Sequence, residues 1–588
     1  MNKFTCGKTY ENIINSVLAY SLKKMEEGHS PFEKAIRTLE VPVCDAFKKS
    51  GILAPITFEP GTRVLEPKSE IAESFPNSIA ASRNRILSAG GALTTIVSGK
   101  KVAVLFSGGP AAGGHNVVAG LKAILGPENT LMGIKAGPKG LLKGNMFEIT
   151  DDHVKQIMNT GGFNFMGTDR TKIEKPEDID KVKTVCRELN IDAIVVIGGD
   201  DSNTNAALLA EKLFFDVKED GSGVQVIGVP KTIDGDLQLG DELPISFGFD
   251  TATKIYAEKV GNLLRDTSSS LKYWHFVRLM GRSASHVTLE VALQTHPTIA
   301  LISEEVRESN ITLSDIVDSI ANTVIERAKK GLNYGVVLVP EGLIEFIPGF
   351  TTLIDDLNDK MAQFKDELIG INIKEQLLFM YSKLSQSHGE LLESLPDPIK
   401  YKLMADRDEH GNLPVSQIET ETMLSSAVKA RINELDGNMK FESLNHFFGY
   451  EARCGASTVF DSSYTYNLGA TAGSLILDGR TGYMASLTDL DKGAKPLGIP
   501  IASLLDIEIR KGKPAKVIEK ALVKLDSPAF IYFESRRKLW AENDLSNSPG
   551  PVQLWGPTSR QLPKTVALNR GYHSLDFTFT TDQEKEHR

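Results

Sequence analysis

The sequence has few cysteines, no long apolar run and no excess of basic residues. Its four cysteines, Cys6, Cys44, Cys186 and Cys454, are scattered without a CxxC pair, which is typical of a reducing compartment and argues against a zinc site. No apolar run approaches the roughly 18 residues that a membrane span needs, and the polar start has no signal-peptide core. We therefore expect a cytoplasmic protein without a membrane partner.

Acidic residues outnumber basic ones, and the formal net charge of the 588 residues is -10. A chain of this charge is a poor general binder of nucleic acid, so we expect no nucleic-acid partner. Hydrophobic residues make up 41% and charged residues 24%, which are ordinary values for a folded protein of roughly three or four domains. Such a protein binds anions only through a local cationic pocket.

From about residue 100, short apolar runs alternate with helical patterns. The five runs are KVAVLFS, DAIVVIG, VQVIGV, WHFVRLM and YGVVLV. Continuous Val/Ile runs between helices are typical of parallel strands buried on both faces, so the pattern predicts an α/β fold. We expect an N-terminal extension at 1–98, a charged helical insertion at 346–445 and a C-terminal surface tail at 549–588.

The chemistry gathers where the apolar runs end. In open parallel sheets, ligands bind beyond the carboxyl ends of the strands, and glycines there let backbone amides approach phosphate oxygens. Five turns along one such pattern predict a site for a phosphorylated ligand. The turns are SGGPAAGG (107–114), GGDDSN (198–203), PKTIDGD (230–236), MGRS (280–283) and PEG (340–342).

Two of these turns also have plainer interpretations. SGGPAAGG lacks the spacings GxxxxGK[ST] and GxGxxG, so alone it favours a structural turn over a phosphate site. PKTIDGD places Lys231, Asp234 and Asp236 close together, which in isolation indicates a surface ion pair. After a buried strand and beside other glycine turns, we favour a carboxylate that takes a hydroxyl proton and a lysine that holds a phosphate.

Together, GGDDSNTNAA, PKTIDGDL and MGRSASHVTLEVALQ resemble the phosphofructokinases, specifically their long pyrophosphate-dependent form, over about residues 70–545. The resemblance implies an α/β fold of two Rossmann-like parallel-sheet halves. These are a phosphate-donor half at 99–247 and a sugar-phosphate half at 248–345, and residues 446–548 return to complete both.

The resemblance also implies an activity. A glycolytic and gluconeogenic phosphotransferase of this kind reversibly moves a phosphoryl group from pyrophosphate to O1 of fructose 6-phosphate, giving fructose 1,6-bisphosphate and phosphate. Mg²⁺ is the implied cofactor, and a homodimer or higher homo-oligomer is the implied assembly.

Each motif residue has an implied role. Gly108 and Gly109 bind pyrophosphate through backbone amides, Asp200 coordinates Mg²⁺ and Lys231 contacts the phosphoryl group. Asp234 is the base that deprotonates the sugar hydroxyl. The other implied sugar-site residues are Thr232, Ile233, Met280, Gly281, Arg282, Glu341, Tyr450 and Arg453, with Lys272 and Tyr273 reaching the neighbouring subunit's site.

Asp201 is the residue that separates the two donor classes, because ATP-using relatives have Gly there and a small residue at the position of Lys231. A carboxylate placed where a third phosphate would lie repels it, since two unit charges ~4 Å apart interact by about 4 kcal/mol at an effective dielectric near 20. That is roughly three decades of discrimination. We expect Asp201 to reject ATP and to act with Lys231 and Asp234; a favourable charge at a helix start is the alternative.

Two departures from the family pattern concern loop shape. Pro110-Ala111-Ala112 replaces Gln-Ala-Pro, and Ala452 replaces the glycine of Tyr-Glu-Gly-Arg. Neither removes a charged or proton-transferring group. Of the remaining candidates, Arg170 and Lys172 either reach the donor or lie in a solvated loop, and we expect His286 to be a packed core residue.

Two rival functions have the same overall pattern. The first is an ATP-dependent 6-phosphofructokinase, which Asp201 and Lys231 oppose. The second is a non-catalytic regulatory subunit, which the presence of Asp200 and Asp234 opposes.

Overall fold

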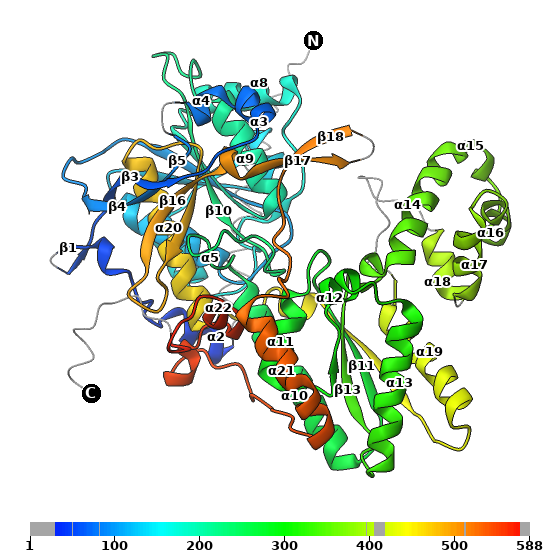
Figure 1. Cartoon of the computed structure of the whole chain (residues 1–588). Helices are drawn as coiled ribbons and strands as arrows, with labels where there is room; N and C mark the ends of the chain where they lie inside the picture. Colours follow the sequence, from blue (N-terminus) through cyan, green and yellow to red (C-terminus); the bar gives the residue numbers. More distant parts are fainter. Residues whose placement is uncertain are drawn as a thin grey trace.

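The computed structural model describes residues 30–49, 51–80, 83–395, 397–404, 418–510 and 513–576. The chain forms two lobes on separate sheets, one at the upper left of Figure 1 and one at the lower right. Cys6 and the start of the expected N-terminal extension lie outside the described residues.

The larger lobe contains a ten-stranded sheet whose centre is parallel, as the apolar runs predict. Parallel pairing joins five central strands, β15, β10, β9, β5 and β6. Antiparallel pairing adds β16, β4 and β3 on one side and β7 on the other. Strands β3 and β4 come from the expected N-terminal extension, so this part of it belongs to the sheet. The order is β3 (Ile56–Val64), β4 (Arg85–Ala92), β16 (Lys495–Pro500), β15 (Tyr483–Thr488), β10 (Gln225–Pro230), β9 (Ala193–Gly198), β5 (Lys101–Ser107), β6 (Thr130–Ile134) and β7 (Met146–Glu148), with β8 (Thr168–Asp169) on β5.

Strand β5 shows why the apolar runs are continuous. Its alternate residues Val102, Val104 and Phe106 belong to the main core, whereas Ala103 and Leu105 belong to a second core on the other face. Both faces are covered by helices, so neither set of side chains meets water. The main core includes α5 (Gly114–Leu125) and α20 (Val459–Leu477), and the second includes α8 (Pro176–Glu188) and α9 (Asp200–Lys212).

Helices α5 and α20 pack closely because each has a glycine at the contact. A Cβ at Gly120 would overlap the carbonyl oxygen of Tyr466, and a Cβ at Gly469 would overlap that of Val117. The close approach of the two backbones holds the start of α5, and with it the first Gly-rich turn, over the sheet.

The smaller lobe contains a four-stranded parallel sheet in the order β12 (Ile299–Ala300), β13 (Gly335–Pro340), β11 (Trp274–Leu279) and β14 (Ser443–Phe448). One face joins the main core through α10 (Phe249–Ser270) and α11 (His286–Thr295). The other face packs on α13 (Leu313–Lys329) and α19 (Thr420–Leu435). The predicted α/β architecture is therefore present in both lobes.

The helical insertion is shorter than the expected 346–445. Helices α14 (Pro348–Gln363), α15 (Lys365–Leu368), α16 (Ile373–Tyr381), α17 (Gln386–Ser394) and α18 (Asp397–Leu403) extend from the small lobe at the right of Figure 1. Helix α19 and strand β14 instead belong to the small lobe itself, because α19 packs on α13 and β14 pairs with β11.

The C-terminal segment also differs from the expected surface tail. Helix α21 (Pro528–Asn543) is followed by α22 (Lys564–Asn569), and Leu562 and Val566 are buried in the main core. The buried carboxylate of Glu290 accepts a 2.8 Å hydrogen bond from the backbone amide of Lys564. The segment is therefore anchored in the core through α22.

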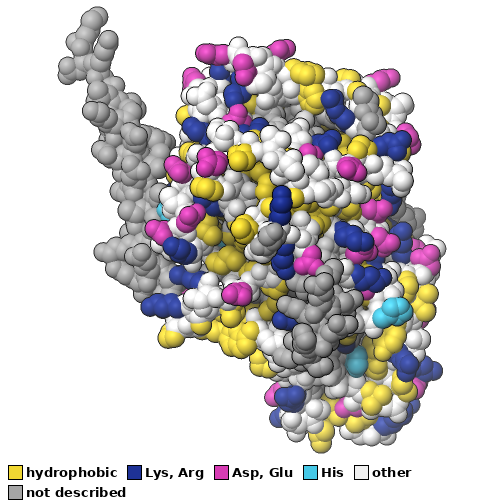
Figure 2. Space-filling view, turned by 90° about the vertical axis from the view of Figure 1, so that its left-hand side faces the viewer, with side chains coloured by type: hydrophobic (Ala, Val, Ile, Leu, Met, Phe, Trp, Pro, Cys, Tyr) yellow, Lys and Arg dark blue, Asp and Glu magenta, His cyan; other side chains and the backbone are white. Residues whose placement is uncertain are grey.

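Acidic and basic side chains are interspersed on the face seen in Figure 2, where the described residues form no continuous basic area. In the described part of the chain, every helix is too short or too polar to cross a bilayer.

Candidate active site

Three of the five predicted turns meet at one edge of the large sheet. Strands β5, β9 and β10 are parallel neighbours, so the turns that follow them share their carboxyl ends. The backbone amide of Lys231 donates a 2.9 Å hydrogen bond to Gly198 O. The Ser202 hydroxyl donates to the Ser107 hydroxyl at 2.8 Å. These two bonds link the three turns.

Gly108 leaves space beside Lys231 because it has no side chain. Its N–H donates to Asp169 O at 3.0 Å, so this amide has an acceptor within the protein, and its contact with pyrophosphate stays a prediction. Its φ of +83° favours glycine. A Cβ at this position would lie 3.5 Å from the ammonium of Lys231, so glycine keeps that side of the lysine open.

Arg453 lies on the first Gly-rich turn, where sequence reasoning did not place it. Its Nε donates a 3.3 Å hydrogen bond to Pro110 O, and a Cβ at Gly109 would overlap its guanidinium. Arg453 follows β14 of the small lobe, so it connects the two lobes at the donor turn. The structure places Arg453 against the first Gly-rich turn, and its role in the sugar site stays a prediction.

Lys231 is the buried cation at the centre of these turns, with only 7% of its surface exposed. Burial and, to a lesser extent, the positive charge of Arg453 lower the pKa of its ammonium to about 8, whereas Asp234 and Asp200 oppose the shift. Its charge is therefore more costly without an anion than that of an exposed lysine. A bound phosphate would relieve this cost.

Asp200 and Asp201 are the first two residues of α9, and they face different cations. Asp200 Oδ2 lies 3.9 Å from Lys520 Nζ with its side chain 25% exposed. Asp201 Oδ1 lies 3.6 Å from Lys172 Nζ with its side chain 51% exposed. The two carboxylates therefore occupy an inner and an outer position, and Lys172 does lie beside this helix start.

The turn after β10 combines a buried and an accessible carboxylate. Asp234 is half-buried, and its amide donates a 3.1 Å hydrogen bond to Thr232 Oγ1. Ile233, expected at the sugar site, instead buries its side chain in the main core, so only its backbone is available to a ligand. Burial and the charge of Asp234 raise the pKa of Asp236 to about 7.

In the small lobe, Glu341 organises the turn that contains Gly281 and Arg282. Glu341 follows β13 and is buried, and its Oε2 accepts a 3.0 Å hydrogen bond from Gly281 N on the adjacent strand end. Burial raises its pKa, the Gly281 bond opposes the rise, and the nearby Asp234 adds to it. Glu341 thus holds the turn at Arg282 while facing Asp234 across the lobes.

The residues that depart from the family pattern in the two loops are packed against the rest of the protein. Ala111 and Ala112 are fully buried, and a Cβ at Gly248 would come within 2.7 Å of the Ala111 methyl. Ala452 is fully buried in the main core. The neighbouring Tyr450 is exposed, and its ring centre lies 5.1 Å from the Arg453 guanidinium. The substituted residues shape both loops by packing.

Lys272 and Tyr273 are not brought into the site of their own chain. They precede β11, whereas Met280 and Arg282 follow it. Tyr273 has a φ of +71°, and the Lys272 ammonium lies 5.2 Å from its ring centre.

The family model for phosphofructokinase matches residues 101–476. The chain belongs to the phosphofructokinase family. It is 44% identical over 509 residues to the pyrophosphate–fructose 6-phosphate 1-phosphotransferase of Porphyromonas gingivalis, covering 84% of this chain and 91% of that protein. It is 45% identical over 495 residues to the enzyme of that name from Entamoeba histolytica, covering 81% and 90%. It is 44% identical over 484 residues to the beta subunit of the Solanum tuberosum enzyme, covering 80% and 82%.

The structure also shows which residues of this phosphofructokinase the sequence motifs missed. Lys520 follows the hairpin of β17 (Leu505–Arg510) and β18 (Lys513–Ile518), which pairs with neither main sheet, and no glycine turn marks it. Glu345 lies beyond the PEG turn with an exposed side chain, close enough to Arg282 and Lys520 for their charges to act on it. The expectation for His286 is confirmed, because it is buried and its Nε2 lies 2.8 Å from Ala521 O.

The donor set fits a magnesium ion held partly by substrate. Among the described residues, no group of three or more His, Cys, Asp or Glu side chains is arranged to hold a metal. Mg²⁺ usually binds one or two carboxylates and completes its shell with phosphate oxygens and water. Asp200, partly exposed at the turn edge, is a ligand of that kind.

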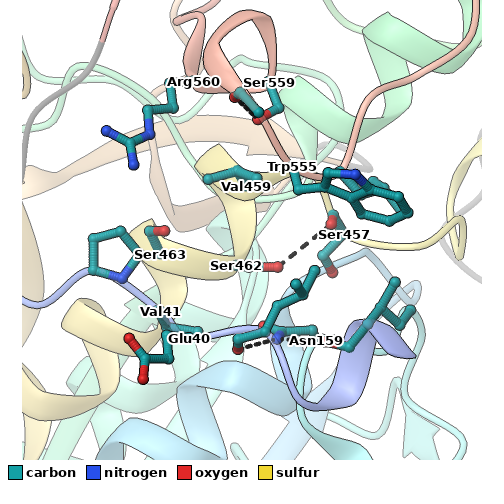
Figure 3. Close-up of a pocket in the computed structure, with 15 residues that line it drawn as sticks. Glu40, Val41, Asn159, Ser457, Val459, Ser462, Ser463, Trp555, Ser559 and Arg560 are labelled. Atoms are coloured by element: carbon teal, nitrogen blue, oxygen red, sulfur yellow. Dashed lines mark hydrogen bonds between the residues drawn. The ribbon is translucent and has the colours of Figure 1, made fainter. Parts of the chain in front are cut away.

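A separate pocket of about 140 Å³ lies between the segment after α2 (Pro31–Arg37), the start of α20 and the C-terminal segment (Figure 3). Asn159 lies in its wall, and its amide donates to Ile36 O at 2.8 Å and Leu39 O at 2.9 Å. Trp555 covers one side. The pocket lining includes none of the residues of the turns described above, so this pocket is not the active site.

Proposed function

We propose that the chain transfers a phosphoryl group from pyrophosphate to O1 of fructose 6-phosphate, giving fructose 1,6-bisphosphate and phosphate. The observation that carries the proposal is the position of Lys231 and Asp234 between the lobes. Lys231 is buried against the Gly108 turn with Asp200 nearby, and Asp234 lies close enough to Glu341 of the small lobe for the two charges to interact. The relatives named pyrophosphate–fructose 6-phosphate 1-phosphotransferase support the choice of substrates.

In this mechanism Asp234 accepts the proton of the sugar 1-hydroxyl. The O1 oxygen forms a bond to one phosphorus of pyrophosphate, and the bond from that phosphorus to the bridging oxygen breaks. The electron pair leaves with the departing phosphate. General-base assistance of this kind contributes roughly 10²–10⁴ in rate. Asp234 suits the role because it is accessible while its neighbour Asp236 is buried.

The cations of the donor turn compensate the charge of pyrophosphate. Positioning and charge neutralisation supply most of the catalysis in phosphoryl transfer. Lys231 acts from within the turn, and Arg453 acts from the small-lobe side over Gly109. Because both groups are held before the substrate arrives, little reorganisation is needed during the reaction.

Asp200 would hold the Mg²⁺ that accompanies pyrophosphate. The metal would withdraw charge from the phosphate oxygens when bound. Asp201 lies on the outer side of the same helix start, beside Lys172. We assign it the exclusion of ATP, since its carboxylate would repel a third phosphate.

We also propose that the chain works as a homodimer or higher homo-oligomer in the cytoplasm. Lys272 and Tyr273, at the end of β11 opposite to Arg282, would serve the neighbouring subunit. The three described cysteines, Cys44, Cys186 and Cys454, are free, which suits a reducing compartment. Mixing subunits inactivated separately at Lys272 and at Asp234 should restore part of the activity if the sites are shared.

A coupled assay with purified protein tests the proposed function. Fructose 6-phosphate and Mg²⁺ are supplied with either pyrophosphate or ATP, and fructose 1,6-bisphosphate is measured. We expect turnover with pyrophosphate and at least roughly a hundredfold less with ATP. Equal use of ATP would favour the ATP-dependent alternative. No turnover with either donor would favour the regulatory subunit.

A further inference from the structure

Lys520 places a cation between the metal-site carboxylate and the sugar-side turn. Its Nζ donates a 2.6 Å hydrogen bond to Ser283 Oγ, which follows Arg282 in the small lobe. The same Nζ lies 3.9 Å from Asp200 Oδ2 in the large lobe. An ammonium has three donors, and the Lys520 side chain remains 32% exposed. The Ser283 hydroxyl and the more distant Asp200 carboxylate do not use all three N–H donors.

Hydrogen bonds to both lobes fix the backbone of the segment that follows Lys520. The backbone amide of Ala521 donates to Asp236 O at 2.7 Å, and Ala521 O lies 2.8 Å from His286 Nε2. Two residues later, the amide of Val523 donates to the buried carboxylate of Glu304 at 3.0 Å. The same Glu304 oxygen accepts the Ser285 amide at 3.1 Å. These bonds hold the ammonium in place, although its hairpin lies outside both main sheets.

Acidic residues from several elements surround Lys520. Asp200 faces it from α9, Asp236 from the turn after β10 and Glu345 from beyond β13. The positive charge of Lys520 opposes the raised pKa of the buried Asp236. Without a cation here, three carboxylates would border the path between donor and acceptor, and they would repel a phosphate.

We propose that Lys520 contacts the phosphoryl group during transfer, as a catalytic cation in addition to Lys231. The proposal rests on the proposed function. The group that moves must pass between the donor turn and the sugar turn, and Lys520 already joins Asp200 of the first to Ser283 of the second. In phosphoryl transfer the charge is spread over the equatorial oxygens, so a cation there stabilises the transition state.

A structural role predicts different results from a catalytic one. If Lys520 only neutralises Asp200, Asp236 and Glu345, its removal should lower thermal stability and leave the rate of the folded protein nearly unchanged. If it contacts the phosphoryl group, the rate should fall in both directions of the reaction. Affinity for inorganic phosphate, the second product, should also weaken.

The experiment compares Lys520→Met, Lys520→Arg and Ser283→Ala with wild type. We expect Lys520→Met to lose about 100-fold in kcat in both directions, the loss typical of one preorganised donor. Lys520→Arg should recover part of the loss, and Ser283→Ala should lose less because the ammonium remains. Lys516→Met, an exposed lysine of the same hairpin with its Nζ 5.6 Å from the Phe75 ring centre, should match wild type.

Binding measurements separate this inference from the proposed function. Calorimetric titration with inorganic phosphate, with Mg²⁺ present, should show weaker binding to Lys520→Met than to wild type, while the unfolding midpoints show that both are folded. Wild-type rates and phosphate affinity in Lys520→Met, with wild-type protein active on pyrophosphate, would overturn only the role of Lys520. Wild-type protein inactive on pyrophosphate would overturn the proposed function itself.

Discussion

Arg453 donates a hydrogen bond to Pro110 O, and its guanidinium covers Gly109, so a residue that follows the small-lobe sheet closes on the donor turn of the large lobe. Only a glycine leaves room for this contact. The consequence is that both lobes contribute residues to the first Gly-rich turn.

Replacing Arg453 with Ala should weaken pyrophosphate binding more than sugar binding. Loss of a hydrogen bond from a charged donor costs about 1.5–3 kcal/mol, so KM for pyrophosphate should rise by about 10- to 100-fold. Steady-state kinetics with each substrate varied in turn would measure the two KM values. Arg431→Ala, on the exposed side of α19, is the control. A change confined to the sugar KM would return Arg453 to the sugar site.

Replacing Asp201 with Gly, alone and with Lys231→Gly, should raise the rate with ATP relative to pyrophosphate by up to about three decades. Asp201→Asn separates charge from volume, because it keeps the shape and removes the repulsion. The ratio of kcat/KM for the two donors is the measurement. Undetectable ATP use in every variant, with pyrophosphate use intact, would contradict the exclusion mechanism.

Replacing Asp234 with Ala should lower kcat by at least roughly 100-fold with little change in the sugar KM, because the base acts only as the hydroxyl loses its proton. Asp152→Ala, at an exposed position in α7 (Asp151–Ile157), should match wild type. If Asp234→Ala keeps more than about a tenth of the activity, another group is the base.

The affinity for pyrophosphate should fall as the pH rises above about 8, because Lys231 then loses its charge in the free protein. A bound anion favours the charged form, so binding takes up a proton in this range.

The same group has the opposite effect on folding stability. Between about pH 8 and 10.5 the unfolded chain holds the proton that the folded chain has lost, so this group increases the free energy of unfolding as the pH rises. A pH series of pyrophosphate KM, repeated with Lys231→Arg, checks the first statement; an unchanged profile in that variant would contradict it.

Replacing Gly120 with Ala should destabilise the large lobe, because the new methyl would overlap the carbonyl of Tyr466 across the α5–α20 contact. Overpacking of this kind costs about 1–3 kcal/mol. Gly91→Ala is the matched control, since a Cβ there meets nothing within 4 Å. Thermal unfolding followed by circular dichroism would compare the two midpoints. Equal midpoints would mean that α5 and α20 separate at little cost.

Much of the sheet architecture could be predicted from local patterns. The runs that became β5, β9, β10, β11 and β13 are mainly apolar because both faces of the sheets are covered. Such runs can be recognised from consecutive residues alone. The turns after them were predictable for the same reason. The edge strands β3 and β4 and the buried α22 were not, because their partners come from distant parts of the chain.

The residue types of the candidate site were visible in the motifs, whereas their partners depended on packing. Lys231 and Asp234 stand three residues apart, so their common position needed only the strand that precedes them. Arg453 and Pro110 are 343 residues apart, and Lys520 reaches Ser283 across 237. The Gly108 amide is taken by a carbonyl from another turn. Such hydrogen bonds form only when distant segments, within one lobe or from both lobes, fold against each other, because no local pattern encodes the distance between them.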